Sequence, residues 1–454
     1  MIDKQHAQAR KGIFLIDASG GFAKDGPKNR LRAQDIHRIV DTWRKRLDVP
    51  GYARMVSAAE IEKNEFNLNL TRYIDSQARE DLQDIAGHLL GGIPLADVDA
   101  LGAYWAVCPS LRRTLFAPLR KGYVQLAVDK GAIRSTILEH KEFVAFVRGQ
   151  EAHFATWRQR ASKSLRQLER ACQPKDVIAE LSEGLLEHYR GQPLLDAYDV
   201  YQKLMEYWVE TMQDDAYLIS AAGWIEGVVP REILQVKDKN GKLVWPETHD
   251  FTSGRRRFRS DLVPGELLIA KFLMPQQSRL EKAKLQLDRV EQLMEEQRNE
   301  HADEGGLLED VVEIDGDNSK ITAKAVKAWL RENADDESTA EERVAVAGYA
   351  ALQAQQASLK SAAKEATAEL HASMARRYRD LTSEDIRKLV VDSKWLETLA
   401  RDVRGEFERI GQRLTERCGE LAERYEAPLP EIARRVEDLE GKVRSHLEKM
   451  GFAW

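Results

Sequence analysis

The sequence has few cysteines, few prolines and few glycines for its length. Its 454 residues include 3 Cys, 13 Pro and 28 Gly, whereas 43% of the residues are hydrophobic and 32% are charged. Three scattered cysteines, an odd number, argue against a disulfide framework and against a metal cluster. This much apolar and charged sequence excludes a disordered or collagen-like chain, and its length corresponds to about three domains.

Long apolar runs are also missing. The most apolar stretches, such as residues 262–270, are broken by proline or charge well before the roughly 20 residues that a membrane-spanning helix needs. The first residues, Met1-Ile-Asp-Lys-Gln-His, show no apolar segment behind a basic leader, so we expect no secretory signal. We therefore predict a cytoplasmic protein that makes no contact with a membrane.

Motifs for common catalytic chemistry are absent as well. The ten histidines form no His-Glu-x-x-His pattern, and the sequence contains no Gly-x-Ser-x-Gly and no Gly-x-x-x-x-Gly-Lys run. Acidic residues cluster between positions 196 and 215, but helical spacing would place them on different faces, which favours a solvated surface over an acid/base pair. We predict no catalytic residue, no cofactor-binding residue and no metal ligand in this chain.

Charge is distributed unevenly. Residues 1–280 carry 41 Lys and Arg against 37 Asp and Glu, and residues 281–454 carry 28 against 38. Within the first part, residues 111–170 hold 13 basic and 5 acidic side chains, which suggests a surface that faces an anionic partner. The alternative is that these basic residues only solvate helix faces. The candidates from this segment are Arg158, Lys163, Arg166 and Arg170.

The pattern of apolar residues predicts a mainly α protein. One strand is expected at residues 12–17, followed by a glycine-rich loop, and Ile36, Ile39, Val40 and Trp43 predict a helix over residues 32–46. No second convincing strand occurs in the first 220 residues. The strand at residues 12–17 is therefore expected to pair with strands from outside this part of the chain, as if the chain began within a domain.

The middle of the chain is predicted to be helical over residues 76–225, with an amphipathic basic helix at 153–172. Asn240-Gly241 stands between the apolar runs 233–237 and 242–245, which predicts a β-hairpin. Four arginines surround one aromatic residue directly afterwards, a composition that suits phosphate contacts or a solvated loop. These residues are Arg255, Arg256, Arg257 and Arg259.

Beyond residue 275 the sequence predicts long coiled-coil helices. Apolar residues recur three and four positions apart over residues 280–294, 349–370, 403–425 and 432–450. The short connection at 427–430 predicts that the last two helices pack antiparallel. The acidic segment 295–339 is expected to be a mobile linker or tip with only a modest helix at 321–330. Thr382-Ser-Glu-Asp385 is expected to begin a helix with an N-cap and an acidic residue three positions on. The predicted domains are 1–75, 76–225, 226–275 and 276–454.

Several short motifs follow one another in the first 75 residues. They are Lys11-Gly-Ile-Phe-Leu-Ile-Asp-Ala-Ser19, Lys28-Asn-Arg-Leu31, Tyr52-Ala-Arg-Met-Val-Ser57 and the segment 60–73. This set resembles the closing segment of the methyltransferase domain in modification subunits of type I restriction-modification systems. The rest of the chain is similar to long-tailed variants of that subunit, for example at Tyr207-Trp208 and Lys394-Trp395. The resemblance implies the remnant of an α/β methyltransferase domain, one strand plus helices, ahead of the helical regions.

Subunits of this family transfer a methyl group from S-adenosylmethionine to adenine N6 of DNA. That chemistry needs a glycine-rich cofactor loop and an Asn/Asp-Pro-Pro-aromatic loop that holds the flipped adenine. The sequence contains no Pro-Pro pair, and Ser19-Gly-Gly-Phe22 lacks the pattern of the cofactor loop. The resemblance therefore implies the carboxy-terminal portion of a subunit, truncated, split or mis-started, which alone binds no S-adenosylmethionine and is inactive.

The resemblance also implies partners. These are DNA, a specificity subunit, the missing catalytic half and a restriction subunit. Four residues of the family-like segment are predicted to face the catalytic half or DNA, with capping and core packing as the alternative: Asn64, Asn67, Arg72 and Tyr73. Leu352 and Leu359 are predicted to contact helices of the specificity subunit, unless all four long helices form one bundle. The competing function is a helical protein-interaction scaffold, which salt-dependent binding to duplex DNA would exclude.

Overall fold

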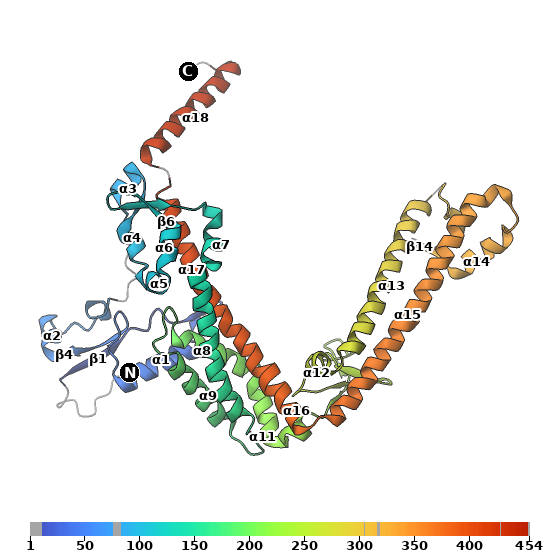
Figure 1. The fold of residues 1–454 in the computed structure, drawn as a ribbon, viewed down its shortest axis with the longest axis horizontal. Helices are drawn as coiled ribbons and strands as arrows, with labels where there is room; N and C mark the ends of the chain where they lie inside the picture. Colours follow the sequence, from blue (N-terminus) through green and yellow to red (C-terminus); the bar gives the residue numbers. More distant parts are fainter. Residues whose placement is uncertain (1–10, 76–82, 304, 316–317, 427, 453–454) are drawn as a thin grey trace. The chain divides into compact units, whose positions relative to one another are not determined.

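The computed structural model describes residues 11–75, 83–303, 305–315, 318–426 and 428–452 (Figure 1). Residues 1–10 of the first predicted domain and Ala427 of the predicted last turn lie outside this range. Helices dominate the described residues, so the mainly α class is confirmed. Contacts group the chain into two units, Met1–Tyr217 with Trp395–Trp454, and Leu218–Lys394. The boundary predicted at residue 275 does not coincide with a boundary between these units.

The first unit begins with a two-stranded antiparallel sheet. The strand predicted at residues 12–17 is confirmed as β1 (Gly12–Ile16), which pairs with β4 (Ala53–Ser57). The expectation of a single strand was therefore wrong. A turn at Gly51, with φ of 69°, returns the chain so that β4 pairs with β1. Between the two strands lie the hairpin β2 (Ala23–Asp25) and β3 (Lys28–Arg30) and the predicted helix, α1 (Ala33–Lys45).

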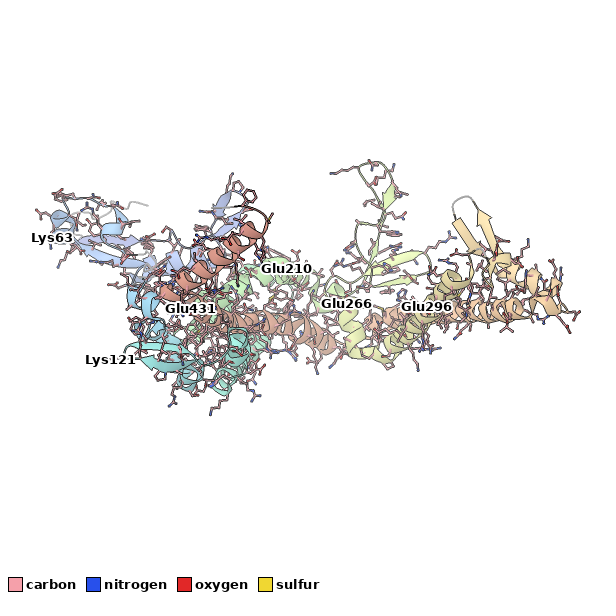
Figure 2. All side chains as sticks on the ribbon, turned by 90° about the horizontal axis from the view of Figure 1, so that it is seen from above. Lys63, Lys121, Glu210, Glu266, Glu296 and Glu431 are labelled. Atoms are coloured by element: carbon pink, nitrogen blue, oxygen red, sulfur yellow. The ribbon has the colours of Figure 1, made fainter. Side chains whose placement is uncertain are left out.

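A second small sheet lies in the region that was predicted to be purely helical. Its strand order is β5-β7-β6, with a left-handed Gly122 beside Lys121 in the turn (Figure 2). Ile93, Phe116 and Val124 are buried with the surrounding helices, which explains why these short strands form. The strands are β5 (Ile93–Pro94), β6 (Phe116–Arg120) and β7 (Tyr123–Leu126). The helices are α3 (Ile85–Leu90), α4 (Leu95–Asp99), α5 (Gly102–Val107), α6 (Pro109–Leu115), α7 (Ile133–Leu138), α8 (Lys141–Leu165), α9 (Pro174–Tyr189) and α10 (Ala197–Tyr207).

Helix α17 (Glu397–Arg424) lies beside α8 (Figure 1) and contributes residues to the core of this unit. Phe407 and Leu414 of its predicted stripe are buried, and Ile410 packs in one cluster with residues of α6 and α8. At Gly411 an added Cβ would lie 2.7 Å from Leu138 Cδ2. The glycine therefore permits the close approach of α7 and α17.

Helix α18 (Leu429–Lys449) does not pack along α17. It has no buried residue, and its main contacts are with α3. The predicted antiparallel pairing of the last two helices was therefore wrong. The physical reason is that the apolar stripe of α17 is already covered by α7, α8 and α10.

The second unit contains a long helical hairpin. Helices α13 (Met274–His301) and α15 (Ala340–Asp380) lie side by side and antiparallel (Figure 1). Ion pairs fix their register at Arg279–Glu369, 2.7 Å, and at Lys360–Glu291, 3.1 Å. The apolar stripes predicted at 280–294 and 349–370 thus face each other within one unit.

The acidic segment 295–339 is folded and differs from the predicted mobile linker, but the modest helix predicted within it at 321–330 is confirmed as α14 (Ala323–Glu332). The segment also contains β13 (Val312–Asp315) and β14 (Asn318–Ile321). Its sparse apolar residues, among them Leu308, Val326 and Trp329, pack on Val346 and Tyr349 of α15. The many acidic residues on the surface of this segment therefore made its small hydrophobic core difficult to predict from composition.

The remaining strands of the second unit form two small sheets. The predicted hairpin around Asn240-Gly241 is confirmed as β9 (Val236–Lys237) and β10 (Leu243–Val244). The arginine-rich stretch is a strand, in a sheet ordered β11-β12-β8 that comprises β8 (Arg231–Ile233), β11 (Phe251–Ser253) and β12 (Arg256–Arg259). The N-cap predicted at Thr382 is confirmed at α16 (Ser383–Arg387), as a capping box with Asp385. In the described ranges, no helix is both long and apolar enough to span a membrane.

Candidate functional site

Helix α1 turns its polar side toward the protein and its apolar side outward. Asp35 and Asp41 are buried, whereas three apolar residues are exposed. These are Ile36 at 51%, Val40 at 38% and Trp43 at 46%. A helix on the surface of a complete domain has the opposite arrangement. The apolar side of α1 is therefore uncovered by the described part of the chain.

Polar contacts with α10 and its first turn hold α1 in this orientation. The Tyr198 hydroxyl donates a hydrogen bond to Asp41 at 2.9 Å, and the Gln34 amide donates to Asp199 at 3.0 Å. Burial acts to raise the pKa of Asp41, but hydrogen bonds from Lys45 and Tyr198 hold this pKa below its ordinary value. The charged form of Asp41 is thus the one that the fold stabilises.

The sheet beside α1 continues the exposed apolar surface. Phe14 of β1 lies opposite Met55 of β4, which is 51% exposed, and β1 pairs with no other described strand. The Arg46 guanidinium lies 5.2 Å from the Phe14 ring centroid and 5.1 Å from that of Trp43. The half-buried Phe14 and the exposed Trp43 thus share Arg46 as a neighbour, and the apolar residues of this strand pair and of α1 are here called the amino-terminal apolar face: Phe14, Ile36, Val40, Trp43 and Met55.

A polar cavity of about 390 Å³ lies where β1 ends. Its walls come from the loop after β1, the first turn of α1, α10 and the residues before β4. The Asp17 amide donates to the Tyr52 carbonyl at 2.7 Å, and the Arg38 guanidinium lies 4.5 Å from the Tyr52 ring centroid. A Cβ at Gly21 would lie 2.9 Å from Asp35 Oδ1, so glycine allows the loop to close onto this carboxylate.

Four of the six charged residues that line this cavity form two ion pairs, whereas Asp17 accepts from the Ser19 amide and Asp199 from the Gln34 side chain. Arg32 donates to both carboxylate oxygens of Asp35, each at 2.9 Å, and Arg38 pairs with Asp196 at 3.2 Å. Burial acts to raise the pKa of Asp35, but its hydrogen bonds with Arg32 hold this pKa below the ordinary value. Among the described residues, no group of three or more His, Cys, Asp and Glu could hold a metal ion. The two ion pairs hold Arg32 and Arg38 at the wall of the cavity.

The segment from Asn64 to Tyr73 is held by local hydrogen bonds. The Asn64 side chain donates to the Glu60 carbonyl at the end of α2 (Ala58–Lys63), and the Tyr73 hydroxyl donates to the Asn67 carbonyl. Tyr73 is also part of a small buried cluster. Arg72 is exposed. Capping and packing thus explain Asn64 and Tyr73, and an interface role for the four residues stays a prediction.

Phe66, in the same segment, was not among the site residues predicted from the sequence. It is 70% exposed, and both Glu65 and Phe66 have left-handed backbones, with φ of 57° and 56°. Non-glycine residues in this conformation cost free energy and concentrate at functional positions. The only sequence signal was Asn residues on both sides, because Asn is common where a chain turns.

Arg158, Lys163, Arg166 and Arg170 were predicted to lie on one helix, but they do not all lie on the same helix. Helix α8 ends at Leu165, so only two of the four lie on it, and Arg166 and Arg170 follow its end. Arg158 forms an ion pair with Glu397 at 2.9 Å. The left-handed Ala171 stands where the predicted helix would have continued. A continuous basic stripe over residues 153–172 is therefore absent.

The four arginines near β12 have different surroundings. Arg259 pairs with Glu247 at 3.3 Å, and the Arg257 guanidinium lies 4.2 Å from the Trp245 ring centroid. The Arg256 side chain is 66% exposed, 3.6 Å from Glu232, and Arg255 is exposed in the turn before the strand. Of the four, Arg255 and Arg256 are the more accessible to a partner.

Leu352 and Leu359 are half-buried on α15, whose neighbour in the same unit is α13. The apolar stripe that they belong to thus has a partner within the chain. Their assignment to an interface with another subunit stays a prediction.

The first 82 residues of the chain match the N-6 DNA methylase family. The match contains β1, β4, α1, the amino-terminal apolar face and the segment from Asn64 to Tyr73. The predicted resemblance is thereby confirmed for this region, which is similar to N-6 DNA methylases and to methylase subunits of type I restriction enzymes.

The similarity to individual relatives also covers only a small part of the chain. The type I restriction enzyme MjaVII methylase subunit of Methanocaldococcus jannaschii is 36% identical over 87 residues, 18% of this chain and 15% of the relative. The MpnII methylase subunit of Mycoplasma pneumoniae is 27% identical over 85 residues, 19% of this chain and 16% of the relative. The chain thus spans about 15% of the length of the curated relatives it matches. No solved structure matches the chain.

Proposed function

We propose that the chain supplies the closing segment of an adenine-N6 DNA methyltransferase of a type I restriction-modification system. The outward apolar side of α1 is the observation that carries this proposal. In α/β domains, helices bury their apolar side on a sheet. The rest of a methyltransferase sheet, which lies outside these 454 residues, would cover the amino-terminal apolar face and bring the cofactor and adenine loops.

On this proposal the chain alone binds no S-adenosylmethionine, the group that supplies the methyl group in the complete enzyme. The polar cavity supports this part of the proposal, because the two arginines of its wall are already paired with Asp35 and Asp196. The contribution of this chain is instead to complete the domain and to bind DNA and the specificity subunit. Exposed Arg255 and Arg256 support the DNA contact.

The test is reconstitution from two polypeptides. The chain would be mixed with a polypeptide that carries the cofactor loop and the Asn-Pro-Pro-aromatic loop of a type I methylase subunit, and methyl transfer to duplex DNA would be measured. We expect a complex and activity only in the mixture. Methylation by this chain alone, or no complex with any such polypeptide, would contradict the proposal.

A variant pair makes the test specific. Ile36→Glu with Val40→Glu places two charges on the amino-terminal apolar face and is expected to abolish the complex. The matched control is Ile432→Glu with Val436→Glu on α18, where the same residue types are 44% and 48% exposed. Equal loss in both variants would show that the effect is not specific to α1.

The second candidate is a helical interaction scaffold that does not bind DNA. The exposed apolar side of α18 favours this function. Titration with duplex DNA at several salt concentrations separates the two, because phosphate contacts make the logarithm of affinity fall linearly with the logarithm of salt concentration.

A further inference from the structure

Helix α18 contacts α3 but carries an apolar stripe that the described chain leaves exposed. Its start is marked by Glu431, labelled in Figure 2. Along its 21 residues every side chain is exposed except the half-buried Leu447. The large exposed apolar residues include Val436, Leu439 and Val443, at 48%, 58% and 56%. A stripe of this length at the regular spacing of a coiled coil indicates a helical partner.

The ends of α18 are well defined, so the stripe belongs to a complete helix. Pro430 occupies the first turn, where its missing N–H costs nothing. At the other end, the Phe452 amide donates to the Leu447 carbonyl and the Gly451 amide to the Glu448 carbonyl, each at 3.0 Å, with Gly451 at φ of 86°. These two bonds form a Schellman motif. The helix thus ends through its own capping, without help from a neighbour.

The residue types along the stripe favour a particular pairing. In heptad notation Val436 and Val443 occupy a positions, and Leu439 between them occupies d. β-Branched residues at a with leucine at d favour two parallel strands. In the same frame Ile432 occupies d and Met450 occupies a, and His446 occupies the d position between Val443 and Met450.

Charges beside the stripe favour the same arrangement. Arg435 occupies g and Glu440 occupies e of the next heptad. In two parallel copies, Arg435 of each helix would lie beside Glu440 of the other, which gives two ion pairs. An antiparallel pair would bring g against g, placing Arg435 near the like-charged Lys442. The helix carries five acidic and five basic residues, so no net charge opposes association.

We propose that α18 pairs with α18 of a second copy of this chain as a parallel two-stranded coiled coil. The chain is then a dimer joined at its carboxy-terminal helix. This inference does not depend on the proposed function, because it uses neither the amino-terminal apolar face nor DNA.

Sedimentation of the full chain over a range of concentrations tests the dimer. We expect dissociation into monomers on dilution, and at least a tenfold weaker association for Val436→Glu with Val443→Glu. At concentrations where both chains are monomeric, the melting temperature of this variant should equal that of the wild type, because α18 has no buried residue in the single chain. The matched control, Ile36→Glu with Val40→Glu, should dimerise like the wild type while failing in the reconstitution.

Charge substitutions test the orientation. Arg435→Glu alone and Glu440→Arg alone should each weaken the dimer, and the double substitution should restore it. In an antiparallel pair Arg435→Glu would instead face Lys442 and strengthen association. A chain that stays monomeric at all concentrations, a dimer insensitive to the valine substitutions, or protection of α18 only by a different subunit would overturn the proposal.

Discussion

Asp41 is the buried charge on which the orientation of α1 depends, and its removal is predicted to destabilise the first unit. It is 8% exposed, accepts a hydrogen bond from Tyr198 at 2.9 Å and pairs with Lys45 at 2.5 Å. A hydrogen bond to a charged group contributes about 1.5–3 kcal/mol. The exposed Lys45 adds about 0.3–0.5 kcal/mol. Asp41→Ala should therefore lower the free energy of unfolding by about 2–3.5 kcal/mol.

The pH dependence provides an independent check. Because the pKa of Asp41 is lowered in the folded state, its contribution is present above the ordinary value near 3.9 and is lost as the pH falls through the lowered pKa. Asp41→Asn keeps an oxygen that accepts from Tyr198 but removes the charge. This variant should lose less stability at neutral pH than Asp41→Ala, and its stability should fall less on acidification than that of the wild type.

Urea unfolding followed by circular dichroism, at neutral pH and near pH 3, measures both effects. Asp48→Ala is the control, because Asp48 is exposed just after α1. Its unfolding midpoint should match that of the wild type. The reasoning is refuted if Asp41→Ala and Asp48→Ala unfold alike, or if Asp41→Asn keeps the full acid sensitivity.

Three further predictions concern other parts of the chain. In urea unfolding, Gly405→Ala should raise the free energy of unfolding by about 1 kcal/mol, because a Cβ at this position meets open space. Gly411→Ala should lower it by about 1–3 kcal/mol, because a Cβ there overpacks the contact of α17 with α7. Equal effects of the two substitutions would contradict the packing of α17. Burial and neighbouring positive charge lower the pKa of His188, so stability should fall as the pH drops below about 6.5, and His188→Gln should flatten this fall in thermal melts. Arg255→Glu with Arg256→Glu should reduce the salt slope of DNA binding without changing the melting temperature; an unchanged slope would exclude these residues from the DNA contact.

Local patterns predicted local structure well. The strand at β1, the helix α1, the Asn-Gly hairpin and the capping box at Thr382 each depend on residues within a few positions of one another. Hydrophobic periodicity and turn chemistry act at this range. The misses were of a different kind: β4 and the strands β5 to β7 are short segments that become strands only where another segment pairs with them.

The acidic segment 295–339 shows why composition misled. Its charged residues outnumber its apolar ones, but the few apolar side chains, such as Val326 and Trp329, face Val346 and Tyr349 on α15. Scattered apolar residues form a core only where another apolar surface lies opposite them. Here that surface belongs to α15, and the hairpin of α13 and α15 places it beside the segment.

The sequence alone determined that this protein is mainly helical, where its long apolar stripes lie and that its amino-terminal region is methylase-like, because these properties reside in periodicity and in short ordered motifs. Tertiary structure alone decided what covers each stripe. The stripes of α13 and α15 cover one another, that of α17 became core, and those of α1 and α18 stayed exposed. The physical reason is that a helical repeat specifies an apolar face but not its partner, which depends on all the other surfaces that compete for burial.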